Sequence, residues 1–159
     1  MKRREQIRMT EQEIAQFLTQ GRSLAVATIS PDGAPHLVAM WYALTDDGKI
    51  ALWMYAKSQK ALNLRRDPRI TCMLESGATY EALRGVQMRG QARLVEGAAA
   101  VQAIGEAIYR RNASSDHPGG ALTTAQLQTI AAQAPKRIGV VVEPTTIASW
   151  DHSKLGGAY

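Results

Sequence analysis

A short basic segment, Lys57-Ser58-Gln59-Lys60, has the residue types that bind a phosphate group. It follows an apolar run and opens a stretch of good helix formers, so we expect it at the start of a helix that directly follows a strand. The first turn of a helix has free backbone N–H groups, which favour an anion. The lysines add positive charge and the serine hydroxyl adds a donor. The segment therefore predicts a phosphate site; the alternative is a serine that caps the helix beside solvated lysines.

Each of two neighbouring apolar runs carries one methionine and two aromatic residues. If the runs are adjacent strands of a hairpin, these side chains form an apolar floor for a flat ring. The alternative is that the same side chains fill the core of the sheet and an interface. The residues are Met40, Trp41 and Tyr42 in the run 36–44, and Trp53, Met54 and Tyr55 in the run 50–56.

Other residues with catalytic or ligating chemistry are too few or too scattered to form a site. The three histidines, His36, His117 and His152, lack the spacing of metal ligands, and we expect His117 in a turn. The single cysteine, Cys72, excludes an internal disulfide and a cysteine zinc site, and we expect a buried, inert thiol. The sequence has no G-x-G-x-x-G motif, so a Rossmann dinucleotide site is not supported.

The 159 residues and the 45% share of hydrophobic residues predict one domain, residues 10–159, preceded by a flexible basic leader, residues 1–9. No apolar run approaches the ~20 residues of a membrane helix, and no signal peptide is visible, so we expect a cytoplasmic protein without a membrane partner. The net charge of +5 fits a phosphate-bearing small molecule, a nucleic acid or an ordinary solvated face. The sequence shows no surface in which aromatic residues alternate with basic ones, so we expect no nucleic-acid partner. The basic clusters are 1–8, 57–69, 109–111 and 136–137.

The local patterns predict a mainly β (α+β) fold in which about six strands form one antiparallel, closed sheet with short peripheral helices. Thr10 and Glu13 form a capping-box pattern that begins a helix, and Gly21 ends that helix. Short turns between the first runs indicate a meander of hairpins, and Gly90 marks a bulge in the longest strand. We expect strands at 23–30, 36–44, 50–56, 69–75, 84–96 and 137–150, and helices at 10–20, 58–68, 97–111 and 123–135.

The order of these elements, together with several short motifs, resembles a known family. A PDGAPH turn is followed by AMWYAL, by AKSQKALNLRRDPR and by a terminal SWDHSKLGG. Over residues 10–155 this arrangement resembles the pyridoxamine 5′-phosphate oxidase-like split β-barrel superfamily. The same motifs are especially similar to its B group of flavin/deazaflavin oxidoreductases, which includes proteins that bind coenzyme F420, a 5-deazaflavin. The NLRRDPR segment is more specific than the strands.

The resemblance implies an FMN-binding split β-barrel whose cofactor site draws on several parts of the chain. The serine and lysine of the family's S-x-K element hold the cofactor phosphate, and here they are Ser58 and Lys60, with Gln59 between them. The strand ahead of this element lines the ring, the strand after the PDG turn follows the ring's other edge, and a tryptophan near the chain end reaches the cofactor across a dimer interface. These residues are Trp53 and Met54 in the first strand, Val38, Ala39, Met40 and Trp41 in the second, and Trp150 near the end.

Departures from the family pattern bear on the cofactor. Val38 stands where true pyridoxamine phosphate oxidases place an arginine that clamps the flavin phosphate, and Gln59 stands where they carry another arginine. The tail DHSKLGGAY has no clean match for their substrate-binding arginine and histidine, which argues against vitamin B6 oxidation. The weaker clamp favours F420 over FMN, because the basic face at 57–69 can form a groove for an acidic tail.

The resemblance therefore implies a homodimeric, F420-dependent oxidoreductase that transfers a hydride to or from a small organic substrate. The alternatives are an FMN-dependent oxidase or reductase on the same fold, and a cofactor-binding protein without turnover. A dimer is also expected because exposed aromatic strands need to be covered. No general acid is evident: we expect structural roles for Tyr42, Tyr55 and His36 and a proton from solvent.

Overall fold

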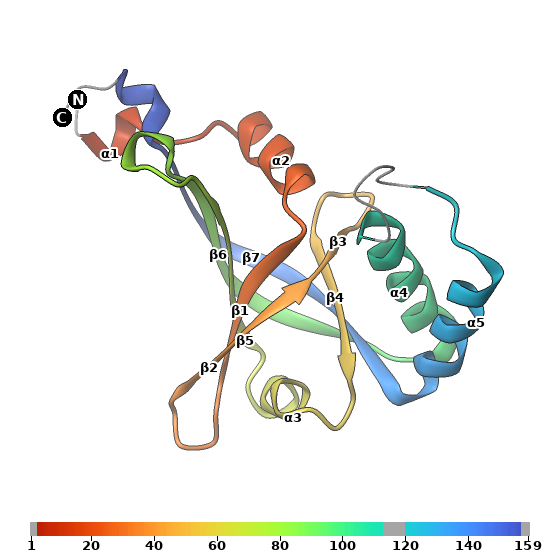
Figure 1. The fold of residues 1–159 in the computed structure, drawn as a ribbon. Coiled ribbons are helices and arrows are strands. Elements are labelled where there is room, and N and C mark those ends of the chain that lie inside the picture. The colour runs from red at the N-terminus through yellow and green to blue at the C-terminus, as the bar shows by residue number, and fades with distance from the viewer. Residues whose placement is uncertain (1–2, 113–119, 157–159) are drawn as a thin grey trace.

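Seven strands form one curled antiparallel sheet in the order β2-β1-β5-β6-β7-β4-β3 (Figure 1). The structure is a computed structural model that describes residues 3–112 and 120–156. The predicted fold class, an antiparallel split barrel with short peripheral helices, is confirmed, with one strand more than expected. The strands are β1 (Ser23–Ile29), β2 (Pro35–Trp41), β3 (Ala43–Leu44), β4 (Ile50–Tyr55), β5 (Arg69–Ser76), β6 (Arg84–Val95) and β7 (Arg137–Asp151).

The additional strand arises because the predicted run 36–44 is divided at Tyr42. The part before Tyr42, β2, pairs with β1, and the part after it, β3, pairs with β4. Strands β2 and β3 are the two outermost strands of the sheet. The chain therefore passes from one edge of the curled sheet to the other at Tyr42. The Tyr42 side chain turns inward, and its hydroxyl donates to the carbonyl oxygen of Leu18 over 2.6 Å.

The prediction that the runs 36–44 and 50–56 are adjacent strands is therefore wrong over most of their length. Only the short ladder between β3 and β4 joins them, through Ala43 opposite Ala51 and Leu44 opposite Ile50. Beyond this ladder β2 and β4 follow opposite edges of the sheet. The two runs do not form a continuous apolar floor within one chain.

The second helix begins at the predicted capping box. The Thr10 hydroxyl accepts from the Glu13 N–H over 3.2 Å, and the Glu13 carboxylate accepts from the Thr10 N–H over 2.6 Å. Gly21 follows the helix in an extended conformation, and a Cβ there would lie 2.5 Å from the Leu74 side chain. Close packing, not a left-handed turn, thus favours glycine at this position.

The helices are α1 (Arg3–Gln6), α2 (Glu11–Gln20), α3 (Gln59–Arg66), α4 (Ala98–Asn112) and α5 (Thr124–Gln133), and the 3-10 turns are η1 (Tyr80–Ala82), η2 (Ala134–Lys136) and η3 (His152–Leu155).

The chain has two apolar cores. The larger lies inside the curl of the sheet and includes Val26, Leu52 and Leu64. The smaller lies between β4 and the helices α4 and α5, and includes Trp53. Helix α4 approaches Trp53 closely because Gly105 has no side chain; a Cβ at Gly105 would lie 2.7 Å from the indole ring. No helix in the described part of the chain is long and apolar enough to cross a membrane.

The bulge predicted at Gly90 is confirmed. The register of β6 against β7 shifts between Arg89 and Gly90. A Cβ at Gly90 would lie 2.0 Å from the carbonyl oxygen of Glu143, a backbone atom that cannot easily move. The glycine therefore lets β7 approach β6 at the point where the ladder changes register.

Residues 3–9, within the predicted leader, contact the end of β7. The Asp151 N–H donates to the carbonyl oxygen of Ile7 over 2.7 Å, and the Met9 N–H donates to the Ser149 hydroxyl over 3.1 Å. These bonds give residues 7–9 fixed partners in the domain. The flexibility of residues 1–9 stays a prediction.

Candidate functional site

The predicted phosphate-binding segment lies where β4 ends and α3 begins. Ser58 is the residue that precedes the helix, but its hydroxyl donates to the carbonyl oxygen of Tyr55 over 2.7 Å and does not cap α3. The alternative that the Ser58 side chain caps the helix is therefore wrong: its oxygen accepts no bond from an N–H of the first turn, and its hydroxyl points back to the turn after β4. The first-turn N–H groups of α3 receive no bond from this side chain, and such a helix start favours an anion.

Basic residues from two strand ends surround this helix start. Strands β4 and β7 pair as far as Tyr55 and Arg137, and the Ala56 N–H donates to the Lys136 carbonyl oxygen over 3.0 Å. The start of β7 is thereby held beside the turn that leads into α3. The basic residues of this region are Lys57, Lys60, Lys136 and Arg137, which we call the basic cluster.

The basic cluster has no acidic counterpart among the described residues. Neither of the segments that meet there, 50–66 and 121–142, contains an aspartate or glutamate. None of the carboxylates in the described ranges forms an ion pair with a member of the cluster. Burial, and secondarily the charge of Arg137, lower the pKa of Lys60. An anion bound at this place would relieve the repulsion.

Asn63 fixes α3 against β1 from inside the protein. Its side-chain amide is fully buried and donates to the Thr28 hydroxyl over 3.0 Å. The Gln59 amide in turn donates to the Asn63 side-chain oxygen over 2.8 Å. The Gln59 side chain is thus bonded to the helix that carries it.

The residues predicted to line a ring are divided between two faces of the sheet. Val38 and Met40 are half-buried against the larger core. Ala39 and Trp41 lie on the opposite face of β2, which points away from this core, and Trp41 is 52% exposed. A cofactor could therefore follow either face of this edge strand. The predicted contacts of all four residues with a ring stay predictions.

Trp53 and Met54 are covered by the protein itself. Trp53 is 7% exposed beneath α4, and Met54 is 1% exposed in the larger core. Successive residues of a strand point to opposite faces, which places one in each core. Any contact of these two residues with a cofactor in this arrangement would involve mainly their backbone, and the contact stays a prediction.

Trp150 lies near the end of β7, and that end of the strand lies at the opposite end of the sheet from α3 (Figure 1). It pairs with Gly85 of β6, and a Cβ at Gly85 would lie 2.1 Å from the indole ring. The glycine therefore allows the ring to lie across β6. A role for Trp150 at a cofactor would require a second chain and stays a prediction.

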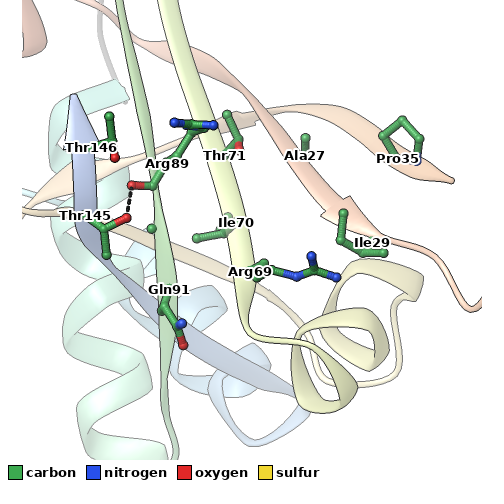
Figure 2. A pocket seen from close by; sticks show the side chains of 11 residues that line it. Ala27, Ile29, Pro35, Arg69, Ile70, Thr71, Arg89, Gln91, Thr145 and Thr146 are labelled. Carbon is green, nitrogen blue, oxygen red and sulfur yellow. Dashed lines mark hydrogen bonds between the residues drawn. The ribbon is translucent and has the colours of Figure 1, made fainter. Parts of the chain in front are cut away.

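One face of five strands is not covered by any helix among the described residues. The register aligns Leu37, Ala27, Thr71, Arg89 and Thr146 in one row across the sheet, and Ala39, Ala25, Met73, Gln87 and Ala148 in the next. We call this surface the outer face. It consists mainly of small or flat side chains, with the exposed Leu37 and Trp41 at one edge. A depression of about 480 Å³ lies on the outer face. Its lining side chains, from Pro35 to Thr146, are drawn in Figure 2 and include Arg69 of the predicted basic face 57–69, but none of the residues predicted to hold the ring or the phosphate.

The arginines expected to extend the basic face at 57–69 have partners of their own. Arg65 forms an ion pair with Glu96 at 2.8 Å, and Arg69 forms one with Asp67 at 2.6 Å. Arg66 donates to the carbonyl oxygen of Ile29. The Arg69 guanidinium lowers the pKa of the Asp67 carboxyl to about 2. In the predicted groove for an acidic tail, Arg65 and Arg69 are therefore paired with carboxylates, whereas Arg66 is bonded to a neutral carbonyl and keeps its charge.

The side chains considered as proton donors, Tyr42, Tyr55 and His36, are each packed against other parts of the protein. Tyr42 is fully buried, and burial raises its pKa. Half-exposed Tyr55 stacks on Arg137, with 4.0 Å between the guanidinium carbon and the ring centroid. His36 lies opposite Thr28, and its buried Nδ1 atom has no hydrogen-bond partner in the described structure.

Cys72 is buried, as predicted, and burial raises the pKa of its thiol to about 12. His117 lies outside the described residues. Across residues 3–112 and 120–156, no three His, Cys, Asp or Glu side chains are grouped to hold a metal ion.

Sequence reasoning missed two residues of this region, Arg137 and Asn63. The pair at 136–137 was visible as a basic cluster, but its position beside α3 depends on the pairing of β4 with β7, which no local pattern reveals. Asn63 left a clearer signal, since it is a polar residue between Ala61 and Leu64 on the buried side of a helix.

Comparison with known proteins agrees with this architecture. The family model for pyridoxamine 5′-phosphate oxidase matches residues 10–151. A conserved hypothetical protein of Mycobacterium tuberculosis is 44% identical, with a TM-score of 0.87 over 100% of this chain and 95% of that one. Among curated proteins, none matches the chain significantly.

Two more distant structures share the fold. A protein named F420 reductase is 24% identical, with a TM-score of 0.62 over 83% of this chain and 93% of that one. The heme storage protein of Vibrio cholerae is 16% identical, with a TM-score of 0.65 over 86% of this chain and 92% of that one.

Proposed function

Because the chain belongs to the pyridoxamine 5′-phosphate oxidase family, we propose that it is an F420-dependent oxidoreductase that transfers a hydride to or from a small organic substrate. The observation that supports this proposal most directly is the start of α3, where the first-turn N–H groups, Ser58 and Lys60 face no described acidic side chain. This donor set fits a phosphate group.

The choice of F420 over FMN rests on charge. Val38 brings no positive group to the phosphate from β2, and the Gln59 side chain bonds to Asn63. A compact terminal phosphate would therefore lack two charge-assisted bonds that an arginine clamp provides. A structural neighbour named F420 reductase has the same fold, which is consistent with the proposal.

The chain's own residues bind and orient the cofactor. The start of α3 holds the phosphate, and β2 follows the ring at the edge of the sheet. When bound, a 5-deazaflavin would supply hydride transfer to or from an organic substrate, with the accompanying proton exchanged with solvent. Tyr42 is buried and bonded to Leu18, which leaves it unsuited to deliver that proton.

A homodimer would complete the site. The outer face exposes 66% of Leu37 and 52% of Trp41 beside the small side chains of Ala25, Ala27 and Ala39 on β1 and β2. A flat apolar sheet face of this kind is commonly buried against a second sheet. We place the dimer interface on this face, from which Trp150 of one chain could reach the cofactor held by its partner.

Removing the Lys60 ammonium tests the proposal. We expect Lys60→Ala to weaken F420 binding about ten- to a hundred-fold, because one charge-assisted bond to phosphate is lost. The matched control is Arg65→Ala, which removes a charge from the same helix but one already paired with Glu96. Fluorescence titration of both variants and circular dichroism of their folds give the answer. Equal affinity of Lys60→Ala and the unaltered protein would contradict the proposed phosphate site.

A further inference from the structure

Arg137 is held rigidly at the start of β7. Its guanidinium carbon lies 4.1 Å from the centroid of the Trp53 ring and 4.0 Å from that of Tyr55. The two rings are two residues apart on β4 and therefore lie on the same face, so the guanidinium is packed between them. The Gln133 side-chain oxygen accepts bonds from its Nε at 3.0 Å and its Nη2 at 2.6 Å.

This arrangement fixes the position of the charge without neutralising it. Both rings and the Gln133 amide are uncharged, and no carboxylate of the described residues pairs with Arg137. A buried or half-buried arginine is normally paired with an acid. An arginine that is oriented in advance but lacks such a partner is suited to bind an anion, since little side-chain entropy is lost on binding.

A second cation lies close to Arg137. The Ala56 N–H donates to the Lys136 carbonyl oxygen over 3.0 Å, which holds the start of β7 beside the turn that leads into α3 and Lys60. Burial, and secondarily the Arg137 charge, lower the pKa of Lys60, in agreement with this placement. The two groups come from different elements, and the pairing of Tyr55 with Arg137 brings them together. By contrast, Arg65 near the other end of α3 and Arg69 at the start of β5 are paired with the carboxylates of Glu96 and Asp67.

We propose that Arg137 and Lys60 together bind the anionic tail of the ligand, its phosphate and the carboxylates beyond it, so that the tail runs over the start of β7 and not along the arginines at 65–69. This assignment rests on the proposed function for the identity of the ligand. The anion site itself depends only on the geometry of the basic cluster, and a simple polyanion can therefore probe it.

The experiment measures binding of inorganic pyrophosphate at constant ionic strength, by calorimetry and by tryptophan fluorescence, which reports on Trp53 beside Arg137. We expect Arg137→Gln to weaken pyrophosphate binding about tenfold or more. Arg137→Lys keeps the charge and should retain most of the affinity. The matched control, Arg65→Gln, removes the same charge from a residue paired with Glu96 and should leave the affinity nearly unchanged.

The outcomes separate this site from the proposed function. Pyrophosphate binding that depends on Arg137 in a protein that does not bind F420 would support the anion site and contradict the proposed function. F420 binding that Arg137→Gln does not weaken, with pyrophosphate binding also unchanged, would contradict the anion site alone. Equal losses in Arg137→Gln and Arg65→Gln would also overturn it, because general surface charge would then account for the binding. Absence of pyrophosphate binding in the unaltered protein would overturn it as well.

Discussion

The ammonium group of Lys60 is half-buried beside Arg137, and both surroundings disfavour its charge. Most lysines are exposed to solvent, and those that are partly buried are usually paired with a carboxylate. An anion bound between Lys60 and Arg137 would compensate both charges and so favour the protonated form of Lys60. The surrounding side chains hold the two groups in place: Asn63 anchors α3, and Trp53 and Tyr55 hold Arg137.

We expect Lys60 to titrate below the ordinary lysine value of 10.5, and its pKa to rise in Arg137→Gln because one repelling charge is gone. Only the charged lysine binds an anion well, so anion affinity should be full below this pKa and fall as pH rises through it. Lys49 is an internal control, because Glu143 and Asp47 raise its pKa. NMR titration of labelled lysines measures both, and a Lys60 that titrates at or above Lys49 would contradict the assignment.

For single residues, the sequence predicted burial better than the direction in which a side chain points. The burial of Cys72 followed from its apolar neighbours and is confirmed, and burial raises the pKa of its thiol to about 12; the inertness of the thiol stays a prediction. The Ser58 hydroxyl could equally have capped the helix, and only the position of the Tyr55 carbonyl decided its direction. Trp41 and Trp53 lie in similar apolar runs, yet one is exposed and the other buried, because α4 packs on β4 and not on β2.

The elements were predicted well where the signal is local. The capping box at Thr10, the bulge at Gly90 and most of the strands agree with the structure. The run 36–44 was expected to be one strand, because nothing in its apolar pattern marks the break at Tyr42. That break depends on a distant partner, the Leu18 carbonyl, and on the two edges of the sheet meeting there.

We expect Gly90→Ala to lower the free energy of unfolding by about 1–3 kcal/mol, since the new methyl group would be forced against the Glu143 carbonyl oxygen. Gln91→Ala is the control on the same strand, exposed and expected to change stability by less than about 0.5 kcal/mol. Urea denaturation followed by circular dichroism measures both. A Gly90→Ala protein as stable as the unaltered one would show that β6 and β7 can separate at the bulge without cost.

The whole molecule presents the outer face as its main unpartnered surface. This face joins residues from β2, β1, β5, β6 and β7, which are not consecutive in the chain. The aromatic runs indicated that these strands needed covering, but the strand order decides that Leu37 and Trp41 lie beside Ala25, Ala27 and Ala39 at one edge of the outer face. The position of Arg137 beside α3 likewise follows from the sheet order, so sequence reasoning could not assign it.

In solution we expect twice the chain mass of 17.3 kDa at micromolar concentration. Leu37→Lys should shift the protein to the monomer, because it places a charge in the apolar interface. Leu62→Lys is the matched control, since Leu62 is 48% exposed but lies on α3, away from the outer face. Light scattering of the three proteins decides between the possibilities: a monomeric unaltered protein, or a Leu37→Lys variant that stays dimeric, would contradict the proposed interface.

The central claim is that this chain binds a deazaflavin in preference to a flavin, and parallel fluorescence titrations with F420 and FMN test it most directly. Both ligands carry a phosphate for the start of α3, but only F420 carries an extended acidic tail that can also reach Arg137. We predict that F420 binds more tightly, and that the preference shrinks at high salt because exposed charges are screened over about 8 Å at physiological ionic strength. Purified protein that is yellow with stoichiometric FMN, or FMN binding at least as tight as that of F420, would contradict the claim and establish the FMN-dependent alternative.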